Sequence, residues 1–151
     1  MPVRIQTAAF DPGAETNAFL AEAGGAGAAV TFTGLVRSLP DDLVEALTLE
    51  CYPELAVNQI EAMIAEAKTR FALLGVTVIH RYGTLPPGDP IVQVMTLAPH
   101  REAAFKGAEF LMDYLKTDAP FWKKEATSEG ERWVEAKQED DAAKDRWRND
   151  D

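Results

Sequence analysis

The sequence has very little of what would place it in several common settings. It has one cysteine, Cys51, so an intrachain disulfide is impossible, and its two histidines form no recognisable metal-binding pattern. No apolar run approaches the ~20 residues that a membrane-spanning helix needs, and the N-terminus lacks an apolar signal segment. We therefore expect a cytoplasmic protein without membrane contact, metal site or cofactor.

Basic residues are also scarce. Fifteen Lys and Arg stand against 25 Asp and Glu, which gives a formal net charge of -10. Such a body repels a nucleic-acid backbone, so we expect no nucleic-acid partner. A length of 151 residues favours one domain with a single substantial core. We predict this domain at 1–137 and a charged tail, frayed or disordered, at 138–151.

The hydrophobic pattern predicts strands and helices in mixture, with tight turns between several strands. Helix signals predict helices from Pro12, with Asp11 as N-cap, to 24–25, from Pro53 to Gly75, and from about 98 to 116. Alternation predicts strands at 3–8, 28–34, 45–52, 76–82, 91–97, 121–127 and 132–136. This mixture favours an α/β (α+β) fold with a largely antiparallel sheet and flanking helices.

The same pattern predicts which side chains are buried. The first helix should bury Phe19 and Leu20, and the second strand should turn Val30 and Phe32 inward. Cys51 alternates with inward-facing leucines, so we interpret it as a small buried hydrophobe and not as a sulfur carrier.

The segment from 98 to 125 gathers basic residues around one helix. His100 and Arg101 lie at the helix start, where free N–H groups and the helix dipole favour an anion. Lys116 lies in the last turn, and Lys123 follows in an extended run. A local basic cluster in an acidic protein indicates an anion-binding catalytic site. Spacing alone leaves solvent-facing positions for His100 and Arg101 equally open.

The residues around the two lysines suggest how they could act. A proline and two aromatics beside Lys116 and Lys123 indicate partial desolvation, which suits an acid, base or nucleophile, although a solvated lysine is the commoner case. Lys124 alternates with Lys123, so only one of them can point into a given site. Arg37 follows a glycine at a strand end, where ligands often bind. His80, in mid-strand, we interpret as structural and hydrogen-bonded.

Several segments resemble the large, catalytic subunit of molybdopterin synthase. They are VTFTGLVR, ALTLECYP, VIHRYGTLPPGD, HREAAF and DYLKTDAPFWKKEATSEGERWVEAK, in collinear order from about Val30 to Lys137. The last of them is highly specific to that family. The resemblance implies an α/β-hammerhead fold and a homodimer within a heterotetramer. The implied partner is a small ubiquitin-like sulfur carrier with a thiocarboxylated Gly-Gly C-terminus.

The resemblance also implies a reaction and its residues. Two sulfurs pass from carriers to cyclic pyranopterin monophosphate, making the dithiolene of molybdopterin in molybdenum cofactor biosynthesis. Lys116 and Lys123 fall on the family's catalytic lysines. The implied substrate-binding positions are Leu35, Val36, Arg37, His100, Arg101, Lys124, Glu125 and Lys137. This sequence reads SLPDD where many family members carry a His-Asn pair after the motif arginine.

The chemistry of this reaction agrees with the residues. A cyclic phosphate requires an anion site, and sulfur transfer from a thiocarboxylate needs a cation near the carbonyl and a proton donor. The predicted function is therefore a sulfurtransferase. The alternative is a non-catalytic scaffold that binds a ubiquitin-like carrier and an anionic ligand. A lyase with His100 as its base lacks an identifiable carboxylate partner.

Helix geometry adds a prediction about assembly. Arg101 and Lys116 lie fifteen residues apart on one predicted helix, which is about 22 Å at a rise of 1.5 Å per residue. A pyranopterin monophosphate is much shorter than this. The sequence therefore predicts a two-fold dimer in which the helix start of one chain completes the lysine pocket of its partner.

Overall fold

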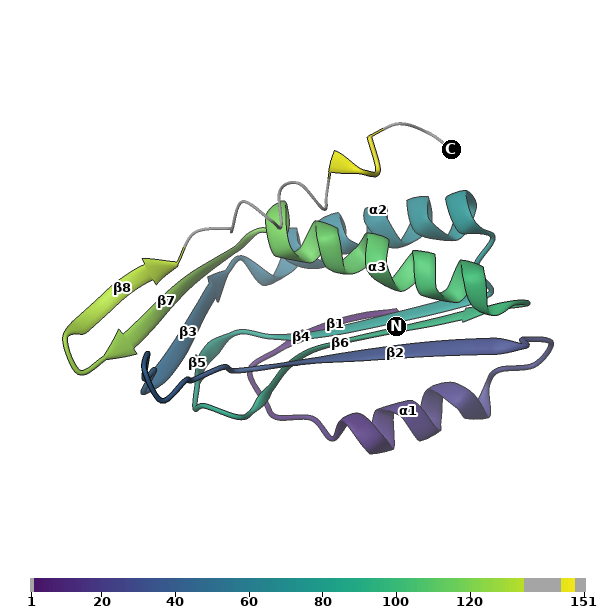
Figure 1. The fold of residues 1–151 in the computed structure, drawn as a ribbon. Coiled ribbons are helices and arrows are strands. Elements are labelled where there is room, and N and C mark those ends of the chain that lie inside the picture. The colour runs from purple at the N-terminus through teal and green to yellow at the C-terminus, as the bar shows by residue number, and fades with distance from the viewer. Residues whose placement is uncertain (1, 135–144, 149–151) are drawn as a thin grey trace.

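The computed structural model describes residues 2–134 and 145–148, which form two four-stranded sheets and three helices (Figure 1). The strands are β1 (Val3–Gln6), β2 (Ala28–Leu35), β3 (Ala46–Cys51), β4 (Gly75–Arg81), β5 (Gly83–Leu85), β6 (Pro90–Ala98), β7 (Phe121–Thr127) and β8 (Gly130–Val134). The helices are α1 (Pro12–Ala21), α2 (Pro53–Phe71) and α3 (Arg101–Thr117). None of these helices is long and apolar enough to cross a membrane.

The larger sheet has the strand order β1-β4-β6-β2, and only its β1–β4 pair is parallel. Helices α2 and α3 lie on one face of it and α1 on the other (Figure 1). The apolar stripes of α2 and α3, which include Ile60, Ile64, Ala104 and Leu111, pack on the buried valines of β4 and β6. The main core therefore lies between this sheet and the two long helices.

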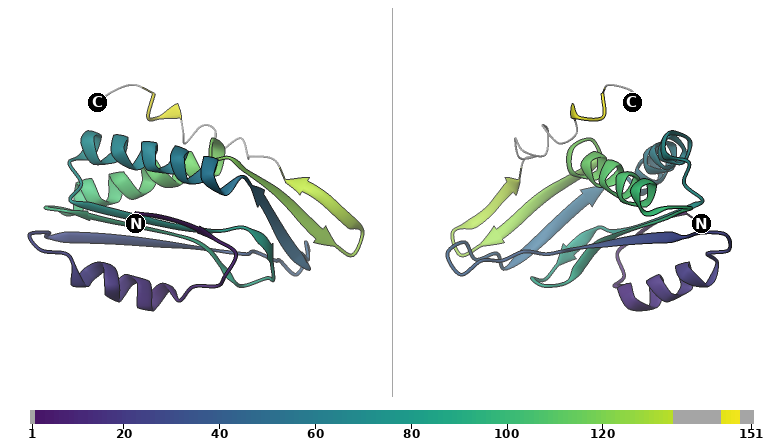
Figure 2. Two further views of the ribbon diagram at one scale, coloured as in Figure 1. Left: turned by 180° about the vertical axis from the view of Figure 1, so that it is seen from behind. Right: turned by 45° about the vertical axis from the view of Figure 1, so that its right-hand side comes forward.

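The smaller sheet has the order β5-β3-β7-β8 and is antiparallel throughout. It extends from one end of the larger sheet, as both views in Figure 2 show. Its own buried cluster is small and consists of Val36, Leu47, Leu49 and Leu85. The chain passes from β4 into β5 through Tyr82, and Gly83 turns it with φ +94°, which favours glycine. One continuous stretch of chain thus serves both sheets.

The predicted mixed fold with largely antiparallel strands is confirmed, as are the Asp11 cap and the last hairpin. The side chain of Asp11 accepts hydrogen bonds from the N–H groups of Gly13 and Ala14 at 3.0 and 3.3 Å. Two boundaries differ from prediction. Part of the predicted TLPPGD turn is strand β5, paired with β3, and α2 ends before Gly75, because Ala72 adopts a left-handed conformation with φ 54°.

The burial predictions for Leu20 and Phe32 are wrong, and those for Phe19, Val30 and Cys51 hold only in part. Phe19 is only half-buried, and Leu20 and Phe32 are 46% and 40% exposed. Helix α1 is held to the sheet partly by polar contacts, since the Gln93 amide donates to the carbonyl of Pro12 at 3.1 Å. Phe32 lies on β2, an edge strand with a neighbour on one side only. Cys51 is also half-buried and not fully buried.

A short part of the predicted tail is described, and it contacts the domain. The ring of Trp147 packs edge-on against Phe71 and Phe110, each at 5.6 Å between centroids. Its Nε1 donates to the carboxylate of Asp113 at 2.6 Å. Residues 145–148 therefore dock on α2 and α3. The domain boundary at 137 lies outside the described residues and stays a prediction.

Candidate active site

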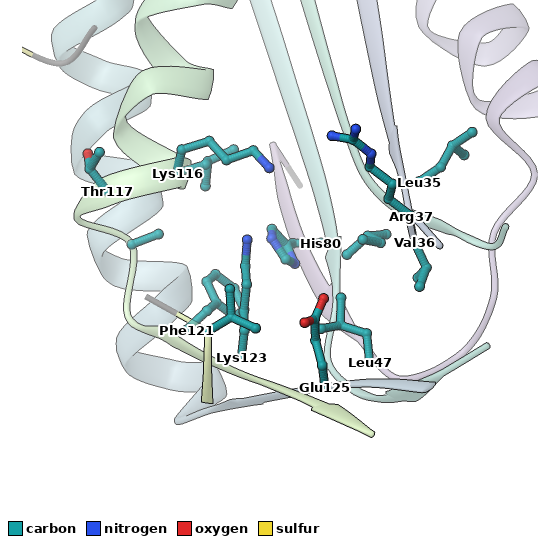
Figure 3. A pocket seen from close by; sticks show the side chains of 14 residues that line it. Leu35, Val36, Arg37, Leu47, His80, Lys116, Thr117, Phe121, Lys123 and Glu125 are labelled. Atoms are coloured by element: carbon teal, nitrogen blue, oxygen red, sulfur yellow. The ribbon is translucent and has the colours of Figure 1, made fainter. Parts of the chain in front are cut away.

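A cavity of about 350 Å³ lies where the end of α3, the start of β7 and the residues after β2 meet (Figure 3). Three cationic side chains, Arg37, Lys116 and Lys123, line it, together with the carboxylate of Glu125 and the imidazole of His80. The remaining lining residues are Leu35, Val36, Leu47, Ile91, Leu115, Thr117, Ala119, Phe121 and Val134. The cavity thus concentrates positive charge in a chain with a formal net charge of -10.

A tight turn brings the two lysines to this cavity from different elements. Lys116 lies exposed in the last turn of α3, and Lys123 lies half-buried on β7. Between them the N–H of Asp118 donates to the carbonyl of Tyr114, and that of Phe121 donates to Ala119, both at 2.8 Å. These bonds end the helix and start the strand within a few residues. Figure 3 shows both lysine side chains extending into the cavity.

The neighbouring lysine points elsewhere. Of Lys123 and Lys124, only Lys123 lines the cavity. The amine of Lys124 lies 5.3 Å from the centre of the Trp133 ring and 3.7 Å from the carboxylate of Glu131. Strand alternation explains this difference, as the sequence predicted. A contact between Lys124 and a ligand in the cavity would involve its backbone.

Arg37 reaches the cavity because the chain after β2 is anchored on both sides. The register shifts between Gly34 and Leu35. Val36, buried to 3% exposure, then donates its N–H to Asp89 at 2.9 Å and accepts from the N–H of Gly88 at 2.8 Å. This anchor leaves the next side chain, Arg37, exposed at the cavity rim, where the sequence predicted it.

Glu125 is the carboxylate of the cavity, and it is held by an arginine. The Arg132 guanidinium donates to Glu125 at 2.9 Å and to Asp42 at 2.9 Å. Asp42 belongs to the loop that the sequence SLPDD forms after Arg37. Through Arg132, Asp42 ties this loop to β7 and β8.

His80 was interpreted from the sequence as structural and hydrogen-bonded, and its place in the cavity was missed. It is buried, with 5% exposure, and its Nδ1 lies 2.8 Å from the carbonyl oxygen of Arg81. Its ring stacks on Phe121 at 4.0 Å. The pKa of His80 is lowered to about 4, mainly by burial; the hydrogen bond with Arg81 opposes this shift, and the charges of Lys123 and Lys116 add to it. No local signal shows that β4 ends beside the lysine turn.

Other predicted site residues lie apart from the cavity. His100 is the N-cap of α3 and Arg101 its first residue; both are exposed, at the end of the helix opposite Lys116. Lys137 lies outside the described residues. The chain by itself therefore brings together Arg37, Lys116, Lys123 and their neighbours but not the two residues at the start of α3.

Cys51 is also separate from the cavity. It lines a shallow pocket on the smaller sheet with Tyr52, Trp122 and Trp133, and burial raises the pKa of its thiol. Within 2–134 and 145–148, no group of three or more His, Cys, Asp and Glu side chains is arranged to hold a metal ion.

Comparisons with known proteins decide the family. A family model described as MoaE protein matches residues 5–118, well over half of the chain. The chain belongs to the MoaE family. The molybdopterin synthase catalytic subunit of Cereibacter sphaeroides is 52% identical over 147 residues, which are 97% of this chain and 100% of that relative.

Solved structures agree with this MoaE assignment. The molybdopterin biosynthesis MoaE protein of Burkholderia ambifaria superposes with a TM-score of 0.81 at 50% identity, covering 96% of each chain. Molybdopterin synthase from Staphylococcus aureus gives a TM-score of 0.80 at 26% identity, covering 89% of this chain and 97% of that one.

These matches confirm the resemblance, the fold class and the predicted enzyme function, that of MoaE-family transferases in molybdenum cofactor biosynthesis. The roles of individual residues stay predictions.

Proposed function

We propose that this cavity binds cyclic pyranopterin monophosphate and that Lys116 and Lys123 catalyse sulfur transfer to it. The observation that carries the proposal is the meeting of Arg37, Lys116 and Lys123 at one cavity of an acidic chain. Three positive charges that converge on one cavity attract an anion to it. A cyclic phosphate and a thiocarboxylate are both anions of suitable size.

The two lysines suit the two electrostatic tasks of the reaction. One task is to stabilise negative charge that develops on the carbonyl oxygen when the thiocarboxylate reacts. The other is to give a proton to the oxygen that leaves the pyranopterin. A half-buried amine on a strand and an exposed amine at a helix end reach the same cavity from different directions. Arg37 adds a bidentate donor for the phosphate.

The sulfur donor in this proposal is a small ubiquitin-like carrier. Its extended Gly-Gly tail threads into the cavity toward Lys116, and main-chain hydrogen bonds supply much of its affinity. Glycine suits a narrow passage because it has no side chain. Replacing the carrier's terminal glycine by a bulky residue should block sulfur transfer, and unchanged transfer would rule out a threaded tail.

The start of α3 enters the proposal through a partner subunit. Helix α3 runs without a break from Arg101 to Thr117, so its ends are too far apart for one small substrate. In a two-fold dimer, His100 and Arg101 of one chain complete the lysine cavity of the other, giving two shared sites.

A mixed dimer tests this assembly. Chains carrying Arg101→Ala and chains carrying Lys116→Ala are each inactive alone. After subunit exchange, half of the dimers are mixed, and one of their two cavities is intact, so roughly a quarter of wild-type activity returns. Exchange without any return of activity would contradict shared sites.

One assay tests the function as a whole. The purified protein is incubated with thiocarboxylated carrier and cyclic pyranopterin monophosphate, and the dithiolene product is measured. A catalytic subunit forms product in an amount set by the carrier sulfur supplied. The alternative, a non-catalytic scaffold, binds both partners and forms none.

A further inference from the structure

The cavity contains a buried imidazole for which the proposed reaction has no stated task. His80 belongs to β4 of the larger sheet, and its ring stacks nearly parallel on Phe121 of β7 in the smaller sheet, with 14° between the planes. Its Nδ1 lies 2.8 Å from the carbonyl oxygen of Arg81. A carbonyl oxygen only accepts hydrogen bonds, so Nδ1 carries the proton and Nε2 carries a lone pair.

The ring lies beside Lys123 for a reason of strand geometry. Phe121 and Lys123 are two residues apart on β7, and side chains two apart lie on the same face of a strand. His80 stacks on Phe121, so Lys123 extends from the same face of β7 into the cavity that His80 lines, and its charge acts on the imidazole (Figure 3). His80 and Lys123 line the same cavity.

The charges around the ring favour a neutral acceptor. Lys116 from α3, Arg37 from the segment after β2, and Lys123 on β7 bring positive charge to the cavity, and Glu125 on β7 brings the carboxylate. The lowered pKa of about 4 leaves His80 neutral near pH 7. A lysine ammonium is a donor only. A neutral imidazole can therefore hold it without adding another positive charge.

We propose that His80 is a positioning residue for Lys123: its Nε2 accepts a hydrogen bond from the amine and directs that amine toward the substrate. The inference rests on the proposed catalytic function of Lys123. The imidazole itself is held firmly, because Arg81 donates from Nε and Nη2 to the carbonyl of Thr7 at 3.2 and 3.1 Å and pairs with Asp89 at 3.2 Å. The position of the amine is thereby fixed to the larger sheet.

Two substitutions of His80 separate positioning from packing. His80→Asn keeps a donor near the Arg81 carbonyl but places nothing at Nε2, whereas His80→Gln carries an amide oxygen that reaches the Nε2 position. Both are made in the full chain and assayed with thiocarboxylated carrier and cyclic pyranopterin monophosphate. We expect His80→Asn to lower kcat about 10- to 100-fold with KM within about threefold of wild type. The kcat of His80→Gln should be about tenfold higher than that of His80→Asn.

A third variant tests the proposal even if the two His80 variants fail to fold. Phe121→Leu keeps an apolar side chain under the ring but removes the stack, so it should lower kcat in the same sense by a smaller factor of roughly 3 to 10. Thermal unfolding of each variant shows whether the fold is kept.

The outcomes separate the two proposals. If His80→Asn and Phe121→Leu both turn over like wild type while Lys123→Ala is inactive, the positioning role is wrong and the proposed function stands. Equal losses in His80→Asn and His80→Gln, matched by equal losses of thermal stability, mean a structural role only and also overturn it. If Lys123→Ala keeps full activity, the proposed function fails, and the positioning role fails with it.

Discussion

The two sheets of this protein differ sharply in how they are stabilised. Among the described residues, the core shared by the larger sheet, α2 and α3 has sixteen buried residues, whereas the cluster of the smaller sheet has four. Yet the smaller sheet supplies Lys123 and Glu125 to the cavity, and most of the larger sheet lies away from it. The larger core is thus separate from most of the cavity lining on β7, and the cavity lies where the two regions meet.

The meeting of the sheets explains why neither is sufficient alone. The end of β4 supplies His80 and α3 supplies Lys116, both anchored in the main core. The partner groups come from β7, which pairs only within the smaller sheet. The well-packed larger sheet with its helices and the less packed smaller sheet therefore each supply some of the residues of the cavity. Substitutions in the main core should therefore lower stability more than activity, and substitutions in the smaller sheet should lower activity more than stability.

The largest effect is expected for the two cavity lysines. Lys116→Ala and Lys123→Ala should each reduce dithiolene formation by about 10³-fold, while the melting temperature changes little, because neither side chain is fully buried. Steady-state assays and thermal unfolding measure both quantities. Lys106→Ala is a matched control, since Lys106 lies exposed on α3, away from the cavity, and pairs with Glu102 at 3.0 Å. Wild-type turnover in either cavity variant would show that the lysine changed in it has no catalytic role.

Two buried leucines compare the sheets directly. Leu111 and Leu49 are each 1% exposed, but Leu111 packs in the large core and Leu49 in the small cluster. Leu111→Ala should cost about 4 kcal/mol and Leu49→Ala about 2 kcal/mol, because the smaller cluster can relax around the cavity left behind. Urea unfolding measures both. Leu49→Ala should nevertheless reduce activity more, and the reverse order in activity would contradict the division.

A smaller effect concerns pH and the residue at the meeting of the sheets. The pKa of His80 falls from 6.5 to about 4 on folding, so the unfolded chain binds more protons between these values. Above pH 6.5 His80 is neutral in both states and does not affect the free energy of unfolding. As the pH falls from 6.5 toward 4, that free energy decreases, by roughly 3 kcal/mol at most. His80→Phe removes this contribution and should flatten the pH dependence of urea unfolding. Identical dependences in both proteins would mean that His80 does not resist protonation.

The smallest effect is expected on the outer face of the smaller sheet. Trp133 is 59% exposed and contacts the Lys124 amine through its ring. Trp133→Ala should lower the free energy of unfolding by less than about 1 kcal/mol, since exposed cation–π pairs contribute little. Trp133→Phe, which keeps a ring, should lie between the two. A loss above 2 kcal/mol would show that this sheet draws its stability from its outer face.

Features with a local cause were predictable from the sequence. The stripes of α2 and α3 show helical spacing, Asp11 stands before a proline as a cap, and residues around Gly130 carry turn signals. Lys116, Lys123 and Arg37 were found through charge, strand ends and motif resemblance. Each of these signals lies within a few residues of the feature it predicts.

Features that depend on distant contacts were not predictable in this way. Strand β5 has three residues, too few for alternation to show, and exists through its pairing with β3. Ala72 ends α2 in a conformation that its residue type disfavours. Phe32 has the pattern of a buried residue but lies on an edge strand. The contact between His80 and Phe121 joins two sheets, so no window of sequence contains it.

The pairing of β3 with β7 also determines when the enzyme becomes competent during its synthesis. All four strands of the larger sheet lie before residue 99, whereas Ala46 on β3 pairs with Ala126 on β7. A ribosome releases the chain from its N-terminus, and so the larger sheet is available for folding first. The lysine on β7 arrives only after most of the 151 residues have been made. A nascent chain that stops short of β7 can contain every strand of the larger sheet and still lack Lys123, one of the two lysines proposed to be catalytic.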